Sequence, residues 1–108
     1  MRLLLIALAL LGLSSSAFSQ TPSAGNITQV RTGWDLDSFA VVTDGPIVNP
    51  ANCPAPDSYI SAIDFAGYRT HYNAVLTAFA AGLPITVWVH NSECYQDRPR
   101  IIGIDFGR

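Results

Sequence analysis

Two acidic residues lie close together in the turn GWDLDS, which begins at Gly33, and a pair of carboxylates is one arrangement that can catalyse hydrolysis. Asp35 and Asp37 are only two positions apart, so strand alternation would place both on one exposed side of the turn, with no evident cleft between them. A Ser-His-Asp triad is a second candidate, but no nucleophile-elbow motif accompanies His71 or His90. The sequence also lacks a phosphate-binding glycine loop, a metal-ligand spacing and a cofactor fingerprint. We therefore expect a protein that is not an enzyme and that holds no cofactor or metal.

The N-terminal segment, residues 1–19, has the pattern of a secretory signal peptide. A positive start at Arg2 is followed by an apolar run from Leu3 to Leu13, and small residues precede the expected cleavage point after Ser19. The run is too short to span a bilayer, which disfavours the alternative of an uncleaved anchor. We expect a secreted or periplasmic protein of bacterial type, without membrane insertion.

The rest of the chain is long enough for one small domain. Residues 20–25 are rich in Gln, Thr, Pro and Ser, and we expect them to be a flexible mature N-terminus that precedes a domain over residues 26–108. The sequence contains no lysine and carries a formal net charge of −2. Nucleic-acid binding requires a clustered positive surface, so we expect no nucleic-acid partner.

The sequence contains two cysteines, Cys53 and Cys94. In an exported chain, an even number of cysteines is typical of a disulfide framework. This bridge would close a loop of about 40 residues, and in the chain-entropy model the constraint stabilises the fold by about 4 kcal/mol. The alternative, a reactive or metal-binding pair of thiols, lacks a CxxC spacing. We therefore expect a structural disulfide.

The stretch from Gly67 to Asn91 predicts one helix, a sharp stop and one strand. Gly82 tolerates the positive φ at which helices end, and Pro84 cannot continue a helix. Over residues 85–90 the apolar period changes from 3.6 to 2, which indicates a strand with one aliphatic face. The apolar residues of the helix share one face, which we expect to cover the core: Tyr68, Tyr72, Val75, Leu76 and Phe79.

Four other segments have the alternation and composition of strands. The first is expected to contain a bulge, because Ile27 and Val30 are out of strict alternation, and residues 91–97 are expected to be a polar loop. Three strands, a helix and two strands predict an all-β fold with one helix: a five-stranded OB-fold barrel with the amphipathic helix between strands 3 and 4. A plain α+β sheet with the helix on one face is the alternative. The four segments are residues 27–31, 39–43, 58–65 and 100–106.

Several features from Tyr68 to Val89 occur together in a known family. They are Tyr72-Asn73 early in the helix, an apolar residue at Leu76, Gly82-x-Pro84 at its end and an alternating aliphatic strand. This run resembles the corresponding part of the B subunit of subtilase cytotoxin, a bacterial toxin in which one enzymatic A chain sits on five OB-fold B chains. Weaker agreement covers Ser38 to Thr43, where a serine leads into a Val-rich strand.

The resemblance implies a contact with a cell-surface glycan at Ser38, since a serine at this point of the toxin subunit contacts a sialylated sugar. Asp35 and Asp37 would lie nearby as acceptors for sugar hydroxyls, and Trp34 could offer a flat apolar face. A tyrosine that also contacts the glycan in the toxin aligns with Val89, which is a departure from the family pattern. The alternative is that GWDLDS is a solvated turn.

Two functions follow from these observations. The first is a non-catalytic binding module of the toxin B-subunit type, which recognises carbohydrate as a homopentamer and carries an enzymatic A-chain partner. The second is a stand-alone periplasmic or envelope interaction or inhibitor protein, acting as a monomer or dimer. Its presentation surface would be the loop from Asn91 to Arg98, with Glu93, Tyr95 and Arg98.

Overall fold

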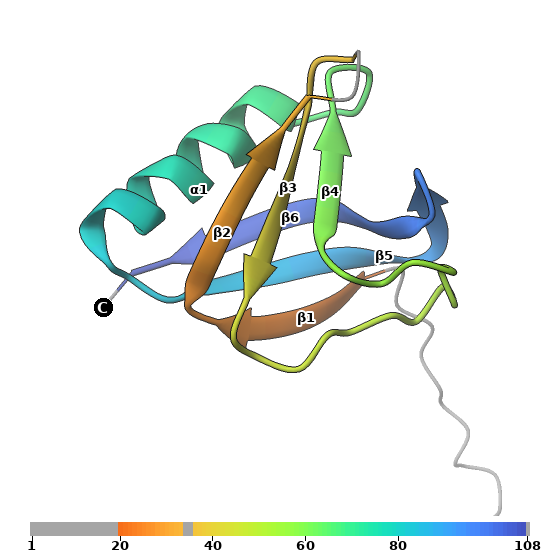
Figure 1. Cartoon of the computed structure of the whole chain (residues 1–108), viewed down its shortest axis with the longest axis horizontal. Coiled ribbons are helices and arrows are strands. Elements are labelled where there is room, and N and C mark those ends of the chain that lie inside the picture. The colour runs from red at the N-terminus through yellow and green to blue at the C-terminus, as the bar shows by residue number, and fades with distance from the viewer. Residues whose placement is uncertain (1–19, 34–35, 108) are drawn as a thin grey trace, which may run out of the picture.

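The computed structural model describes residues 20–33 and 36–107 (Figure 1). The expected signal peptide, Trp34 and Asp35 lie outside these residues. The described part is mostly β structure with one helix and one disulfide. Along the chain the elements are β1 (Gln20–Gly25), β2 (Ile27–Thr32), β3 (Ser38–Thr43), β4 (Tyr59–Ala62), α1 (Tyr68–Ala81), β5 (Ile85–Tyr95) and β6 (Arg98–Phe106).

The strands form one six-stranded sheet in the order β1-β5-β6-β4-β3-β2. Neighbouring strands are antiparallel except β4 and β6, which pair in parallel at Ile60 and Arg100. The end strands β1 and β2 follow each other in the chain and are separated by Asn26 alone. Figure 1 shows that β2, β3 and β4 cross β1, β5 and β6 steeply, so that the sheet encloses the core between its two halves.

The prediction of a five-stranded barrel with the helix after its third strand is wrong: the structure has an open sheet of six strands, and the helix follows β4. The additional strand is β1, the segment that was expected to be a flexible N-terminus. Its composition is unlike a strand, but each of its residues is in register with one of β5, from Gln20 opposite His90 to Gly25 opposite Ile85. Backbone groups make this pairing, and Pro22 is tolerated because β1 is an end strand of the sheet.

The polar residues 91–97, expected to be a loop, are mostly strand. β5 continues to Tyr95, and β6 begins at Arg98 after a two-residue turn. Gln96 and Asp97 both have positive φ, 48° and 67°, which is the backbone of a type I′ hairpin turn. Such turns accept polar residues, which is why composition alone suggested a loop. The expected bulge in β2 is confirmed, because the register with β3 shifts between Ile27 and Gln29.

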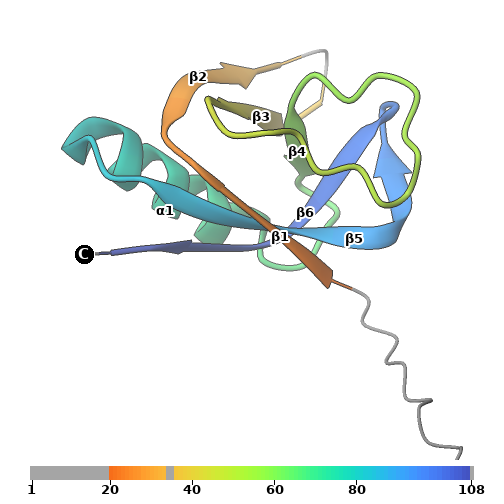
Figure 2. The same ribbon diagram turned by 90° about the horizontal axis from the view of Figure 1, so that it is seen from below.

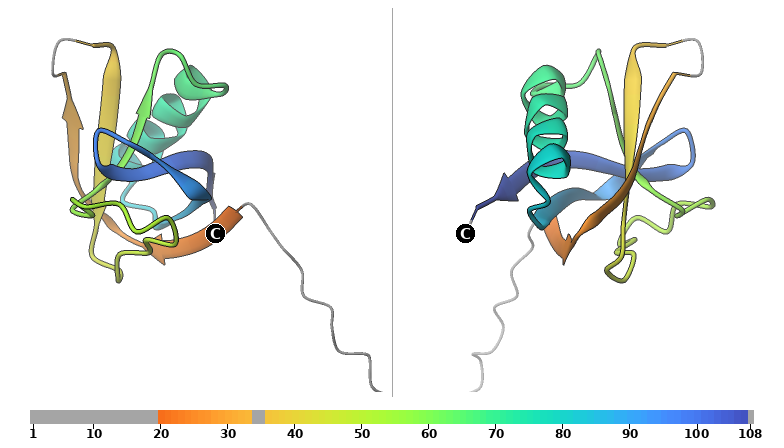
Figure 3. Two further views of the ribbon diagram at one scale, coloured as in Figure 1. Left: turned by 90° about the vertical axis from the view of Figure 1, so that its right-hand side faces the viewer. Right: turned by 60° about the vertical axis from the view of Figure 1, so that its left-hand side comes forward.

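The helix α1 begins and ends where the sequence predicted. Gly67 and Gly82 flank α1 in the left-handed conformation, and the amides of Gly82 and Leu83 bond back to the carbonyls of Phe79 and Ala78. α1 stands on one side of the sheet (Figure 3) and packs chiefly against β6.

The buried face of α1 differs from the predicted one. Tyr68, Val75 and Ala78 are buried, whereas Leu76 and Phe79 are 39% and 48% exposed. The sheet covers only a narrow stripe of the helix, so the neighbouring stripe of the predicted face remains in contact with solvent.

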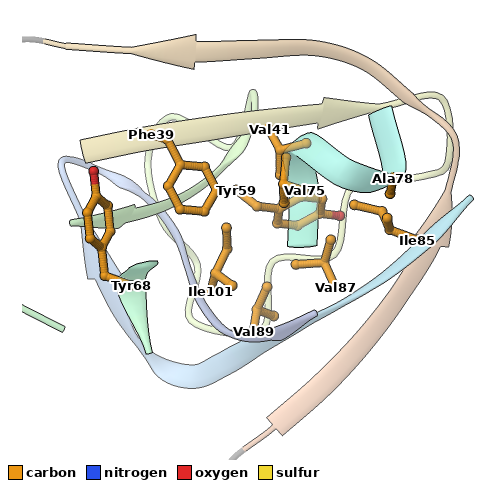
Figure 4. Packing of buried hydrophobic residues seen from close by; sticks show 10 residues of the cluster. All are labelled: Phe39, Val41, Tyr59, Tyr68, Val75, Ala78, Ile85, Val87, Val89 and Ile101. Atoms are coloured by element: carbon orange, nitrogen blue, oxygen red, sulfur yellow. The ribbon is translucent and has the colours of Figure 1, made fainter. Parts of the chain in front are cut away.

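The core combines inward residues of both halves of the sheet with α1 (Figure 4). Phe39 and Val41 from β3 face Ile101 and the β5 valines, and Tyr68 lies at one end of the group. The fully buried members of this cluster, with at most 2% exposure, are Phe39, Val41, Tyr59, Val75, Ala78, Ile85, Val87, Val89 and Ile101.

The expected disulfide between Cys53 and Cys94 is confirmed. It joins the long β3–β4 connection to the end of β5, and these two segments run side by side (Figure 2). The amide of Ala55 also donates a hydrogen bond of 2.8 Å to the carbonyl of Asp97, which links the β3–β4 connection to the β5–β6 turn. The side chain of Asn49 bonds to both the amide and the carbonyl of Cys53, so the buried half of the disulfide is held in place.

Candidate functional site

The β2–β3 loop contains the residues for which sugar contacts were predicted, and Ser38 closes this loop. Ser38 is 3% exposed, and its hydroxyl donates a hydrogen bond of 2.7 Å to the carbonyl of Gly33. The amide of Gly33 in turn bonds to the carbonyl of Ser38. Ser38 therefore shapes the base of the loop in this conformation, with its hydroxyl directed to the loop backbone. Trp34 and Asp35 lie between these two residues, outside the described part.

Asp37 connects the β2–β3 loop to α1 and to the β4–α1 connection through hydrogen bonds. Its carboxylate is exposed, and Oδ1 accepts a hydrogen bond of 2.8 Å from the hydroxyl of Tyr68 at the start of α1. Its carbonyl accepts a second bond of 2.9 Å from the amide of Ile63, just after β4. Burial, together with the bond to Asp37, raises the pKa of Tyr68 to about 12. The β2–β3 loop is thus joined to both sides of the β4–α1 connection.

A cleft of about 270 Å³ lies beside this junction. One wall is the β4–α1 connection and the other is the first turn of the helix. Ile63, in the first wall, and Leu36, next to Asp37, are 43% and 48% exposed. The lining residues are Ile63, Phe65, Gly67, Tyr68, Arg69 and Thr70.

The cleft combines the chemical groups that recognition of a small polar organic ligand requires. Arg69 and Thr70 supply side-chain donors, and the exposed carboxylate of Asp37 supplies acceptors. Ile63 and Phe65 supply apolar surface. A ligand with hydroxyl groups along its edge and a C–H face could use both kinds of group.

The residues behind the cleft form a packed aromatic group. The rings of Tyr68 and Tyr72 are nearly parallel, with an angle of 4° between their planes and 6.4 Å between their centroids. Phe39 packs against both rings at 5.7 and 5.0 Å. Tyr68 is therefore fixed by packing as well as by its bond to Asp37, so that this wall is preorganised.

His71 lies beside Gly67, which lines the cleft. Its ring lies so close to the α carbon of Gly67 that a Cβ at that position would be 2.5 Å from Nε2. Burial lowers the pKa of His71, which favours the neutral imidazole. The side chain is half-buried. His90, the other histidine, accepts hydrogen bonds at Nδ1 from the amides of Ser92 and Glu93.

The predicted presentation surface on the β5–β6 hairpin is engaged in internal contacts. Arg98 forms two hydrogen bonds with Asp57, of 2.7 and 3.1 Å, which lower the pKa of that carboxyl group. Glu93 pairs with Arg100. The Tyr95 ring packs edge-on against Phe65, with 5.1 Å between the centroids, and the guanidinium of Arg100 lies 4.0 Å from the Phe65 ring centroid.

Sequence reasoning missed the cleft residues Phe65, Arg69 and Thr70. Gly67 was the available signal, because a glycine at the start of a helix marks a backbone that other residues rarely adopt. In the part of the chain that the structure describes, no three His, Cys, Asp or Glu residues are grouped so that they could hold a metal ion. No helix in that part is long and apolar enough to cross a membrane.

Comparison of the chain with family models, with curated proteins and with solved structures finds no match.

Proposed function

We propose that this chain is an exported, non-catalytic binding module that recognises carbohydrate at the cleft beside the β2–β3 loop. The observation that carries the proposal is the hydrogen bond between Tyr68 and Asp37. It brings the loop predicted to contact sugar, including the carboxylate of Asp37, to the rim of a cleft that the sequence did not reveal. Asp37, one of the residues for which a sugar contact was predicted, and the cleft thus lie at the same end of the molecule.

The chemistry of the cleft suits a sugar. A pyranose ring offers hydroxyl groups, which donate to carboxylates and accept from guanidinium groups, and a C–H face that packs on apolar side chains. Arg69 in the lining and Asp37, which bonds to the lining residue Tyr68, match the first property. Ile63 and Phe65 match the second. Because Tyr68 is held by aromatic packing, little side-chain entropy would be lost when a ligand binds.

The proposed family remains that of subtilase cytotoxin B subunits, with the sheet as a variant of the partly open OB-fold. The path of the chain supports this. The end strands β1 and β2 flank Asn26 and therefore correspond to one bent first strand. With β1 and β2 counted as the first strand, β3 and β4 are the second and third, and the helix falls between the third strand and the fourth, β5.

A homopentamer with an enzymatic A chain is the corresponding assembly. The exposed side of α1 supports a contact between copies, because Leu76 and Phe79 are exposed there and Arg69 is the one Arg, Lys, Asp or Glu among the residues of this helix. Light scattering after size exclusion at micromolar concentration tests the ring. A pentamer is expected, Leu76→Glu should dissociate it, and a monomeric wild-type protein would contradict the assembly.

A glycan array probed with the purified exported protein tests the binding function. We expect Asp37→Asn and Arg69→Ala each to reduce binding about tenfold, the effect of losing one charge-assisted hydrogen bond. Asp64→Asn is the matched control, since Asp64 is an exposed acid in the β4–α1 connection and, unlike Asp37, is not the hydrogen-bond partner of Tyr68. Ser38→Ala tests the predicted sugar contact itself. If binding is found and neither Asp37→Asn nor Arg69→Ala changes it, the cleft is not the site.

The second candidate function is that of a stand-alone interaction or inhibitor protein. The bracing of the β5–β6 hairpin favours it, because the Cys53–Cys94 bridge and the pairing of Asp57 with Arg98 hold the hairpin in one conformation. Affinity capture from the cell envelope with wild type and Tyr95→Ala tests this function. A partner retained only by the wild type would favour it over the glycan module.

A further inference from the structure

A second surface with binding chemistry lies on the outer side of β1, β5 and β6. Side chains directly opposite each other in a sheet share a face, and the face changes at each residue. Ile85, Val87 and Val89 of β5 point into the core. The residues between them therefore point outward, in two rows across the three strands. These rows are Pro22, Trp88 and Gly103, and next to them Ala24, Thr86 and Asp105.

Trp88 lies across Gly103. A Cβ at Gly103 would be 3.4 Å from the Cβ and 3.5 Å from the Cδ1 of Trp88, which is van der Waals contact. One side of the indole thus rests against a position that has no side chain of its own. Trp88 remains partly exposed, and the side of the ring that faces away from Gly103 is the side that this contact does not cover.

The orientation of the indole is fixed by a hydrogen bond. Nε1 of Trp88 donates to Oδ2 of Asp105 over 2.8 Å. The same bond holds the carboxylate of Asp105 at the edge of the ring, while its other oxygen, Oδ1, can accept further hydrogen bonds. Thr86, opposite Asp105 in the register, places a hydroxyl in the same row.

A cavity of about 300 Å³ opens over the row that contains Thr86 and Asp105. Phe106, which is 40% exposed, is the aromatic residue in its wall. The other lining residues are Ala24, Pro84, Ile85 and Gly107.

We propose that this surface, the Trp88–Asp105 platform, is a second carbohydrate site that binds neutral sugars. The exposed side of the indole packs on the C–H face of a pyranose ring, and Asp105 and Thr86 accept or donate hydrogen bonds at the hydroxyl edge. Asp105 is the one charged group in the two rows and the cavity lining, and a carboxylate repels an anionic sugar. The platform therefore selects neutral glycans, and the cavity accommodates the adjoining sugar of a chain. It shares no residue with the cleft that contains Arg69 and does not depend on the function proposed there.

The two tryptophans of the sequence allow a direct test. Trp34→Phe leaves Trp88 as the sole tryptophan, so that its fluorescence reports on the platform alone. The probes are cellohexaose and chitohexaose, two neutral β-1,4-linked hexasaccharides whose flat rings suit an indole. We expect a saturable change in Trp88 emission with at least one of them. No change with either sugar overturns the proposal.

Substitutions then identify the contacts by calorimetry with the hexasaccharide that binds. Trp88→Ala should weaken binding about tenfold or more, as expected for the loss of a central aromatic contact. Asp105→Ala keeps the indole but removes the carboxylate that orients it, and it should weaken binding about fivefold, so that a folding defect of the first variant does not decide the result. Binding that survives both substitutions overturns the proposal. Asp37→Asn separates the two sites: it should lower binding at the cleft and leave the hexasaccharide affinity unchanged.

Discussion

The hydroxyl groups of Tyr59 and Ser23 lie 2.9 Å apart inside the protein and connect β4 to β1, two strands that do not pair with each other. Tyr59 donates to Ser23, and Ser23 donates to the carbonyl of Pro46 over 3.1 Å. The amide of Val48 donates to the hydroxyl of Tyr59 over 2.9 Å. Side chains thus connect β1 to β4 and to the β3–β4 connection, although β1 and β4 are not neighbours in the sheet.

Tyr59→Phe should lower the free energy of unfolding by about 1–3 kcal/mol, because the amide of Val48 and the hydroxyl of Ser23 lose their common partner in a buried environment. Urea denaturation measures the change. Tyr72→Phe is the matched control, since the Tyr72 hydroxyl makes no hydrogen bond to another described residue. Equal effects of the two substitutions would show that the Tyr59 bonds do not stabilise the fold.

The sequence predicted elements better than their arrangement. The helix from Tyr68 to Ala81 was predicted because glycines mark its ends and its apolar residues follow the helical period. β1 was missed because its pairing with β5 uses backbone groups that composition does not reveal. For the candidate site, too, the sequence indicated residue types but not how they are brought together. The residue types of the turn before Ser38 led to the prediction of a sugar contact, which stays a prediction. The cleft could not be predicted, because it depends on the contact of Asp37 with Tyr68 across 31 positions.

Tyr68 should make the free energy of unfolding depend on pH in the alkaline range. The pKa of Tyr68 is about 12 in the folded protein, above the ordinary value of 10, because burial and Asp37 disfavour the phenolate. The folded state therefore keeps a proton that the unfolded state loses, and this contribution to stability is complete below pH 10 and declines as the pH rises toward 12. Denaturation at a series of pH values should show a steeper alkaline decline for wild type than for Tyr68→Phe. Identical slopes would contradict the assignment.

The β5–β6 hairpin is linked to the β3–β4 connection by the Cys53–Cys94 disulfide and by the ion pair of Arg98 with Asp57. Cys53→Ser with Cys94→Ser should lower the free energy of unfolding by about 4 kcal/mol, since the bridge closes a loop with a sequence separation of 41. Asp57→Asn removes the charge that pairs with Arg98 and, over 3.6 Å, with Arg31. Asp57 is exposed, so the loss should be less than about 1 kcal/mol. Guanidinium denaturation measures both. A disulfide variant no weaker than Asp57→Asn would mean that the hairpin is held mainly by its other contacts.

The two glycines that flank α1 should differ in how much stability is lost when each is replaced by alanine. Both have positive φ, 81° at Gly67 and 68° at Gly82, so alanine is strained at either position and should cost about 1 kcal/mol. The space around them differs. A Cβ at Gly82 has no atom within 4 Å, whereas one at Gly67 would be 2.5 Å from Nε2 of His71. Thermal unfolding should therefore show a clearly larger loss for Gly67→Ala than for Gly82→Ala.

The difference between these glycine variants isolates the contact with the imidazole, because the backbone strain is common to both. Adding His71→Ala to Gly67→Ala removes the ring that the new Cβ would meet, and it should bring the effect of the glycine substitution close to that of Gly82→Ala. If Gly67→Ala is equally costly with and without His71, the strain lies in the backbone alone. The imidazole would then not set the shape of the helix start, and His71→Ala should leave glycan binding at the adjacent cleft unchanged.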